Sequence, residues 1–110
     1  MSDRELLELA AKAAGDFTIP KYYRVADDLP VVFMLNDKPW NPLKDDGDAL
    51  RLAVKLRMSL VMFSIYVRVD TVDYEDIYEE YGDDPYTATR RAIVRAAAEI
   101  GKQQEKNNGN

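Results

Sequence analysis

The residues best suited to chemistry in this chain form one acidic stretch, residues 70–84, which we call the acidic tyrosine segment. It carries eight carboxylates and no Lys or Arg, and tyrosines recur within it and directly after it. Tyrosine is enriched at protein interfaces, and carboxylates give charge complementarity to a cationic partner. The segment therefore predicts a partner-binding site. Its predicted contact residues are Asp73, Tyr74, Asp76, Tyr78, Glu79, Glu80 and Tyr81.

Two other interpretations of this segment stay open. It can be a solvated connector whose last acids cap the helix that follows. It can also be a decoy for nucleic acid: in a helix, with ~1.5 Å rise per residue, its charge density along the axis would approach that of one DNA strand, one charge per ~3.4 Å. The decoy hypothesis predicts an inhibitor of a nucleic-acid-binding machine.

The residue inventory argues against catalysis and cofactor binding. The chain has no His and no Cys, which excludes Ser-His and Cys-His nucleophiles and histidine-ligated transition metals. The residues before Gly47 and Gly82 do not have the spacing of a calcium loop, and no Gly-rich phosphate loop is present. Carboxylates are abundant, but nothing in the sequence marks two of them as the buried pair that glycoside cleavage requires. We therefore expect no enzyme activity, no cofactor and no metal, and a function in stoichiometric binding.

Charge and hydropathy narrow the choice of partner. The net charge of −5 disfavours direct nucleic-acid binding, which depends on Lys and Arg displacing counterions from phosphates. The longest apolar run, residues 60–67, is much shorter than the ~20 residues that span a bilayer, so no membrane contact is expected. The absence of cysteine favours a reducing compartment, and we expect a cytoplasmic protein. A protein partner is the first choice, and a homodimer or a homo-oligomeric structural component is the alternative.

Three helices are predicted from capping residues and apolar periodicity. Ser2 and Glu5 form a capping box for a helix over residues 3–14, with Gly15 as its C-terminal cap. Clustered acids before an apolar stripe predict a second helix over 46–57. Asp84 and the following proline begin the third, which Gly101 should end.

The strands predict an α+β fold. Residues 22–26 and 31–35 are predicted to form a hairpin around the turn 27–30, and the alternation over 60–72 predicts one long strand. In that strand Val61, Phe63, Ile65, Val67 and Val69 would face the core, and Ser64, Tyr66, Arg68 and Asp70 would face the wetter side. The element order is then α-β-β-α-β-α, with an antiparallel or mixed sheet of three or four strands in a two-layer or three-layer sandwich. We expect one domain, residues 1–102, followed by a flexible polar tail, residues 103–110.

Two further groups have a functional and a structural interpretation. Arginines on the last helix (Arg90, Arg91 and Arg95) and basic residues on the second (Arg51, Lys55 and Arg57) could grip an acidic partner, but wet helix faces are the more ordinary explanation. Trp40 could be an exposed interface anchor, although as the only tryptophan it is expected to cover the core where the second helix begins.

Two stretches resemble a known family. Trp40-Asn41-Pro42-Leu43 with the acidic Asp45-Asp46-Gly47-Asp48 start of the second helix, and the alanine-rich stretch from Ala88 to Gly101, are similar to small proteins of tailed phages and prophages that carry the phage ABA sandwich domain. The resemblance implies a layered α-β-α fold and a phage or prophage accessory protein with a host or phage protein as partner. It implies no activity, and the decoy hypothesis would then concern a host defence system, as in an anti-CRISPR protein.

Overall fold

The computed structural model describes residues 1–14, 21–23, 32–35 and 38–108. These residues form three helices and two three-stranded antiparallel sheets, in the order β1-β2-β3 and β4-β5-β6. The predicted α+β class and a three-stranded antiparallel sheet are confirmed, and the chain order roughly matches α-β-β-α-β-α with additional short strands. The elements are α1 (Asp3–Ala14), β1 (Lys21–Tyr23), β2 (Val32–Leu35), β3 (Lys38–Pro39), α2 (Asp46–Lys55), β4 (Ser59–Met62), β5 (Tyr66–Asp70), β6 (Ile77–Glu80) and α3 (Pro85–Asn108).

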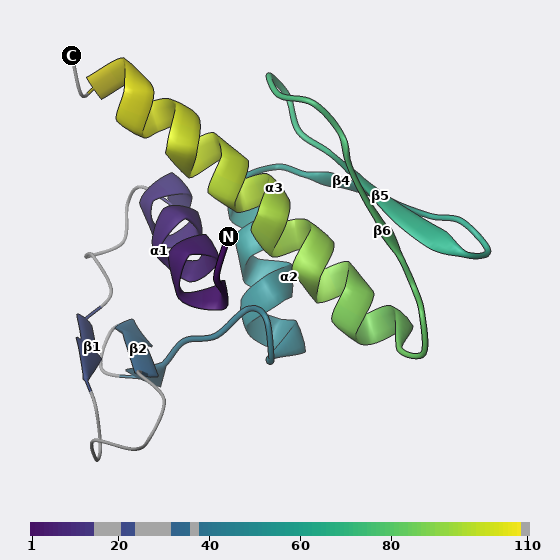
Figure 1. The fold of residues 1–110 in the computed structure, drawn as a ribbon, viewed down its shortest axis with the longest axis horizontal. Helices are drawn as coiled ribbons and strands as arrows, with labels where there is room; N and C mark the ends of the chain where they lie inside the picture. Colours follow the sequence, from purple (N-terminus) through teal and green to yellow (C-terminus); the bar gives the residue numbers. More distant parts are fainter. Residues whose placement is uncertain (15–20, 24–31, 36–37, 109–110) are drawn as a thin grey trace.

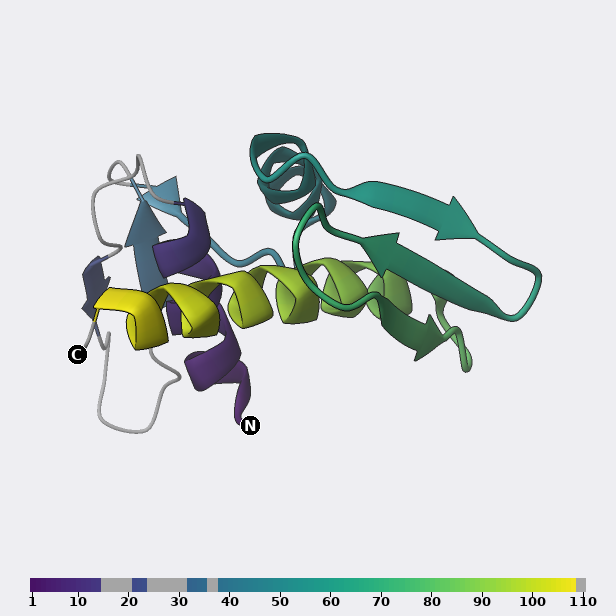
Figure 2. The same ribbon diagram turned by 90° about the horizontal axis from the view of Figure 1, so that it is seen from above.

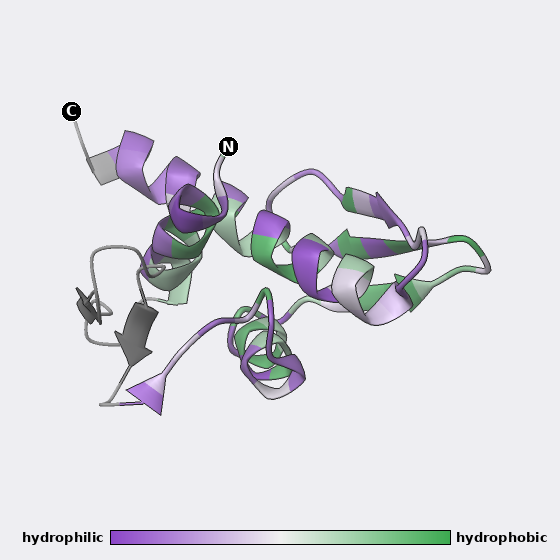
Figure 3. Cartoon of the chain, turned by 60° about the horizontal axis from the view of Figure 1, so that its bottom comes forward, coloured by the Kyte–Doolittle hydropathy of each residue, from purple (hydrophilic) through white to green (hydrophobic). Residues whose placement is uncertain are grey.

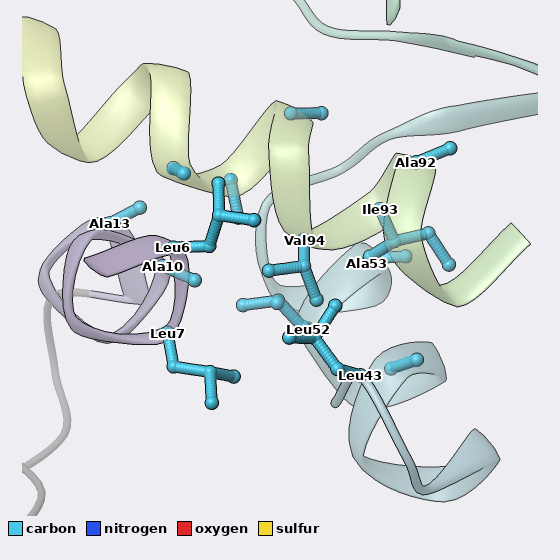
Figure 4. Packing of buried hydrophobic residues seen from close by; sticks show 14 of the residues in the cluster. Leu6, Leu7, Ala10, Ala13, Leu43, Leu52, Ala53, Ala92, Ile93 and Val94 are labelled. Atoms are coloured by element: carbon cyan, nitrogen blue, oxygen red, sulfur yellow. The ribbon is translucent and has the colours of Figure 1, made fainter. Parts of the chain in front are cut away.

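Helix α3 is the element on which the others are assembled. It contacts α1, α2, β5 and β6. Figure 1 shows α3 running diagonally across the molecule, with α1 and α2 on one side and the sheet β4–β6 on the other, and Figure 2 shows the same arrangement from above. Side chains from α1, α2 and α3 meet in the core (Figure 4), among them Leu6, Ala10, Leu52, Ala53, Ile93 and Val94.

The predicted end of α3 at Gly101 is wrong, because the helix continues to Asn108. Residues 103–108, expected to be a flexible tail, are therefore helical. Gly101 is buried inside the helix, and a Cβ added there would lie 2.0 Å from the backbone oxygen of Leu9. The role of the glycine is therefore to let α1 and α3 cross closely, and it does not end the helix. Lys12 of α1 also forms an ion pair with Glu105, beyond the crossing.

The predicted single strand over 60–72 is also wrong, because β4 and β5 form a hairpin. Phe63 N–H donates to Tyr66 O at 2.9 Å, so only Ser64 and Ile65 separate the paired residues. The two residues that flank such a turn point to the same side of the sheet. The odd-numbered apolar positions of β4 therefore share a face with the even-numbered positions of β5.

Part of the acidic tyrosine segment, expected as a connector or a helix, forms strand β6. It pairs antiparallel with β5, with Arg68 opposite Tyr78 and Tyr66 opposite Glu80. In a strand, adjacent side chains point to opposite faces, so the acids of the segment cannot form the continuous helical row on which the decoy hypothesis was based.

The predicted helix starts are confirmed by their capping contacts. Ser2 Oγ accepts from Glu5 N–H at 3.2 Å, Asp45 accepts from Asp48 N–H at 2.8 Å, and Asp84 accepts from Tyr86 N–H at 2.9 Å. The cap at Gly15 and the turn 27–30 lie outside the described residues, while the hairpin itself is confirmed by the pairing of β1 with β2. Pro39 lies on β3 at the edge of its sheet, where a missing N–H is tolerated.

Candidate functional site

The candidate site is the side of the sheet β4–β6 that points away from α3, which we call the open face. Val67 and Val69 are fully buried and point toward α3, so their neighbours Tyr66, Arg68 and Asp70 point the opposite way. The strand register places residues of β4 and β6 beside them. The open face consists of Ser59, Val61, Phe63, Tyr66, Arg68, Asp70, Tyr78 and Glu80.

Three aromatic rings form a continuous row across the open face. The Phe63 and Tyr66 rings stack, with centroids 4.7 Å apart, and the Tyr66 and Tyr78 rings are tilted at 5.9 Å. Phe63 is 37% exposed and Tyr78 is 54% exposed. Figure 3 shows that the turn between β4 and β5, where Ile65 is also exposed, is hydrophobic. An aromatic row of this kind is suited to contact a partner, because tyrosines supply much of the binding energy in protein interfaces.

Arg68 lies in the middle of the open face with its charge matched. Its guanidinium donates two hydrogen bonds to Asp70, from Nε to Oδ1 at 2.8 Å and from Nη2 to Oδ2 at 3.2 Å. The bond to Asp70 raises the pKa of Arg68 above its ordinary value, with burial acting in the opposite direction and the charge of Asp76 adding to the rise. The same guanidinium lies 5.6 Å from the centre of the Phe63 ring, within cation–π distance. Arg68 therefore stays charged and contacts the Phe63 ring.

Four acids lie on or next to the open face, one beside Tyr66 and three in the β5–β6 loop at the end of the sheet opposite the β4–β5 turn. Glu80 is exposed next to Tyr66, Asp76 directly precedes β6, and Asp73 and Glu75 lie in the loop before it. Within the described part of the chain, none of these four carboxylates forms a direct ion pair with Lys or Arg, although Asp76 acts electrostatically on Arg68. The end of the open face next to the β5–β6 loop is consequently negative, while the rings lie toward the β4–β5 turn and Arg68 is matched by Asp70.

The structure divides the seven predicted contact residues into three groups. Tyr78 and Glu80 belong to the open face, and Asp73, Tyr74 and Asp76 lie in or next to the adjoining loop. The other two, Glu79 and Tyr81, have structural contacts.

Glu79 and Tyr81 hold neighbouring elements together. Glu79 points toward α3 and accepts from Arg95 Nη1 at 2.6 Å. Tyr81 OH donates to Phe63 O at 2.7 Å and Tyr81 N–H donates to Ile65 O at 3.0 Å, so Tyr81 fixes the end of the β4–β5 hairpin. Glu79 and Tyr81 support the open face from behind and from its end.

Phe63, Tyr66 and Arg68 are the residues of the site that the sequence did not single out. Tyr66 and Arg68 were assigned to the wet side of a long strand, which indicated their orientation but not their neighbours. Phe63 was assigned to the buried side, and the turn at Ser64 reverses it. The aromatic row exists only because the hairpin and β6 bring the three rings together.

The arginines of α3 do not form a common binding strip. Arg90 donates to Leu43 O at 3.0 Å and to Asp46 Oδ1 at 2.5 Å, Arg91 pairs with Asp3, and Arg95 pairs with Glu79. Each arginine connects α3 to a different part of the molecule. Trp40 is buried, as expected, at the start of the α2 region.

The described residues contain no group of three or more carboxylates arranged to hold a metal ion. Among the same residues, no helix is both long enough and apolar enough to cross a membrane. Comparison with family models, curated proteins and solved structures finds no match for this chain.

Proposed function

We propose that this protein acts by stoichiometric binding of a protein partner through the open face. The observation that carries the proposal is the row of adjoining rings of Phe63, Tyr66 and Tyr78, which lies on a sheet face that points away from α3. Burial of exposed aromatic side chains is a main source of interface energy, and a rigid sheet presents them at low entropic cost.

Charge complementarity indicates the chemistry of the partner. Glu80 lies beside Tyr66, while Asp73, Glu75 and Asp76 lie in the β5–β6 loop at the other end of the sheet, and Asp70 matches the charge of Arg68. The fitting partner is a protein surface with an apolar patch for the rings and with Lys or Arg beside it, toward Glu80 and the β5–β6 loop. The acids would mainly raise the association rate, and the rings would provide the affinity.

The phage or prophage origin and the cytoplasmic location stay predictions from the sequence. In that setting the partner is a host or phage protein, and the chain is an accessory protein that acts without catalysis. The decoy hypothesis is the second candidate. It is supported by the loop carboxylates but weakened by the ion pair that Glu79 forms with Arg95.

The test is affinity capture followed by titration with the captured protein. Tyr78→Ala removes the most exposed ring of the row and should weaken binding by at least about thirtyfold, the lower limit of an interface hot spot. Tyr86→Ala is the matched control, because Tyr86 is 70% exposed at the start of α3 and lies outside the open face. Capture that Tyr78→Ala leaves intact contradicts binding through this face.

Glu80→Lys separates the two candidate functions. Docking around the aromatic row predicts that Glu80→Lys has a smaller effect than Tyr78→Ala and acts mainly on the association rate. The decoy hypothesis predicts the reverse order, together with a steep loss of binding as salt is raised. Glu79 is unsuitable for this test because its reversal would also break the ion pair with Arg95.

A further inference from the structure

The two edges of the sheet β4–β6 differ in how they are protected. Strand β6 contains Glu79 and Glu80, and Arg95 Nη1 donates to the backbone oxygen of Tyr78 at 3.1 Å. Charged side chains and covering groups of this kind prevent an edge strand from pairing with another chain. The β6 edge is therefore blocked.

The β4 edge carries neither charged side chains nor a covering group from another element in the described structure. No charged residue and no proline occurs from Met58 to Val67. Met62 is 56% exposed and Ile65 in the adjoining turn is 68% exposed, while α3 contacts β5 and β6. An uncharged apolar edge strand is a ready template for pairing with another strand.

The hydrogen-bond pattern identifies the backbone groups that β4 leaves free. Phe63 bonds to Tyr66, so in the antiparallel register Val61 and Ser59 also bond to β5. The alternating residues Leu60 and Met62 then direct their N–H and C=O groups away from β5. In the described structure no strand pairs with this edge.

We infer that β4 is the interface of a homodimer, in which β4 strands of two copies pair antiparallel about a twofold axis at Val61. This register places Leu60 of one copy opposite Met62 of the other, so every outward backbone group of β4 finds a partner. Val61 then lies directly opposite Val61 of the second copy, and the exposed Met62 side chain becomes covered.

The charge distribution favours a second copy of this chain as the partner of the β4 edge. The protein has a net charge of −5, so most surfaces of two copies repel each other, but β4 carries no charge to oppose the approach. The result is one continuous sheet in the order β6-β5-β4-β4-β5-β6. Because the axis is perpendicular to the sheet, both open faces lie on the same side.

Sedimentation velocity over a wide range of concentration tests the dimer with two substitutions. Met62→Pro removes an N–H that points outward, which an edge strand tolerates, and Met62→Lys introduces the charge that protected edges carry. Each should raise the dimer dissociation constant by at least about tenfold, from lost hydrogen bonds or from charge repulsion. Val72→Lys, at an apolar residue that is 79% exposed in the loop after β5, is the control and should leave the dimer unchanged.

Amide hydrogen exchange gives a readout at the level of single residues. The amides of Leu60 and Met62 should become protected as concentration rises, whereas the Val61 amide should be protected at every concentration. A monomer at all concentrations, or a dimer that keeps its affinity in both Met62 variants, overturns the inference. Either result leaves the open-face proposal standing, because the Tyr78→Ala test does not depend on the β4 backbone.

Discussion

Replacing Gly101 with alanine should separate two helices that now lie in backbone contact. The added Cβ would stand 2.0 Å from Leu9 O, whereas ordinary contact begins at 3.4 Å, so α1 and α3 must move apart by about 1.4 Å. The clashing atom belongs to the backbone and cannot rotate away. A gap of ~1 Å already forfeits up to half of the dispersion energy between facing atoms, so the loss extends along the crossing.

The expected net destabilisation is about 2–3 kcal/mol. Overpacking in a rigid site costs roughly 1–3 kcal/mol, separation of the helices adds to this cost, and alanine returns about 1 kcal/mol through its higher helix propensity. For a domain of this size the melting temperature should fall by roughly 10–20 °C.

Thermal and urea unfolding followed by circular dichroism measure this effect. Gly47→Ala is the matched control, since its Cβ would meet only side-chain atoms, the Arg51 guanidinium and Asp45 Oδ2 at 3.2 Å, and these side chains are 72% and 60% exposed and able to move. The control should be neutral or stabilising by up to about 1 kcal/mol. A Gly101→Ala protein as stable as the wild type would refute the close crossing of α1 and α3.

Three further substitutions test contacts described above. Arg57 follows Leu56, the C-cap of α2, and has a φ of 55°, so Arg57→Gly should stabilise the protein by about 0.5–1 kcal/mol in urea unfolding. Arg90→Ala removes the guanidinium that bonds to Leu43 O and should cost about 2 kcal/mol, against less than about 0.5 kcal/mol for Arg91→Ala. The hydrogen bond from Thr87, followed by backbone N–H groups, lowers the pKa of Asp84 below its ordinary value of 3.8. A lowered pKa in the folded state means that this stabilisation is present above pH 3.8 and is lost as pH falls through the folded-state pKa, so the melting temperature of Asp84→Ala should approach that of the wild type in acid.

The helix starts were predictable because their signals are local. The caps at Ser2, Asp45 and Asp84 each bond to an N–H two or three residues ahead, so the residue types that form them are visible in the sequence. The end of α3 was not predictable in this way. A glycine at a helix cap and a glycine at a helix crossing look alike until the second helix is known to pass at Leu9.

The candidate site was predicted only in part, for reasons of register and pairing. The alternation in residues 60–72 contains no Gly, Pro or Asn to mark the turn at Ser64, so the faces of β4 were assigned the wrong way round. Strand β6 was missed because Glu79 stands at an inward position, where a strand pattern requires an apolar residue. Its partner Arg95 lies 16 residues away in the sequence, on α3.

The role of α3 as common support has a consequence for the order in which the molecule assembles during synthesis. The contacts of α1 with α3 join segments at opposite ends of the described chain. Helix α2 and strands β5 and β6 also pack against α3, so they too lack their main contact until α3 is present. Until α3 has left the ribosome, the apolar sides of these elements stay exposed to solvent. Long-range contacts of this kind also form slowly. The nascent chain should therefore depend on chaperones until its last helix docks, and the uncharged stretch around β4 is the part most exposed to misassociation in that interval.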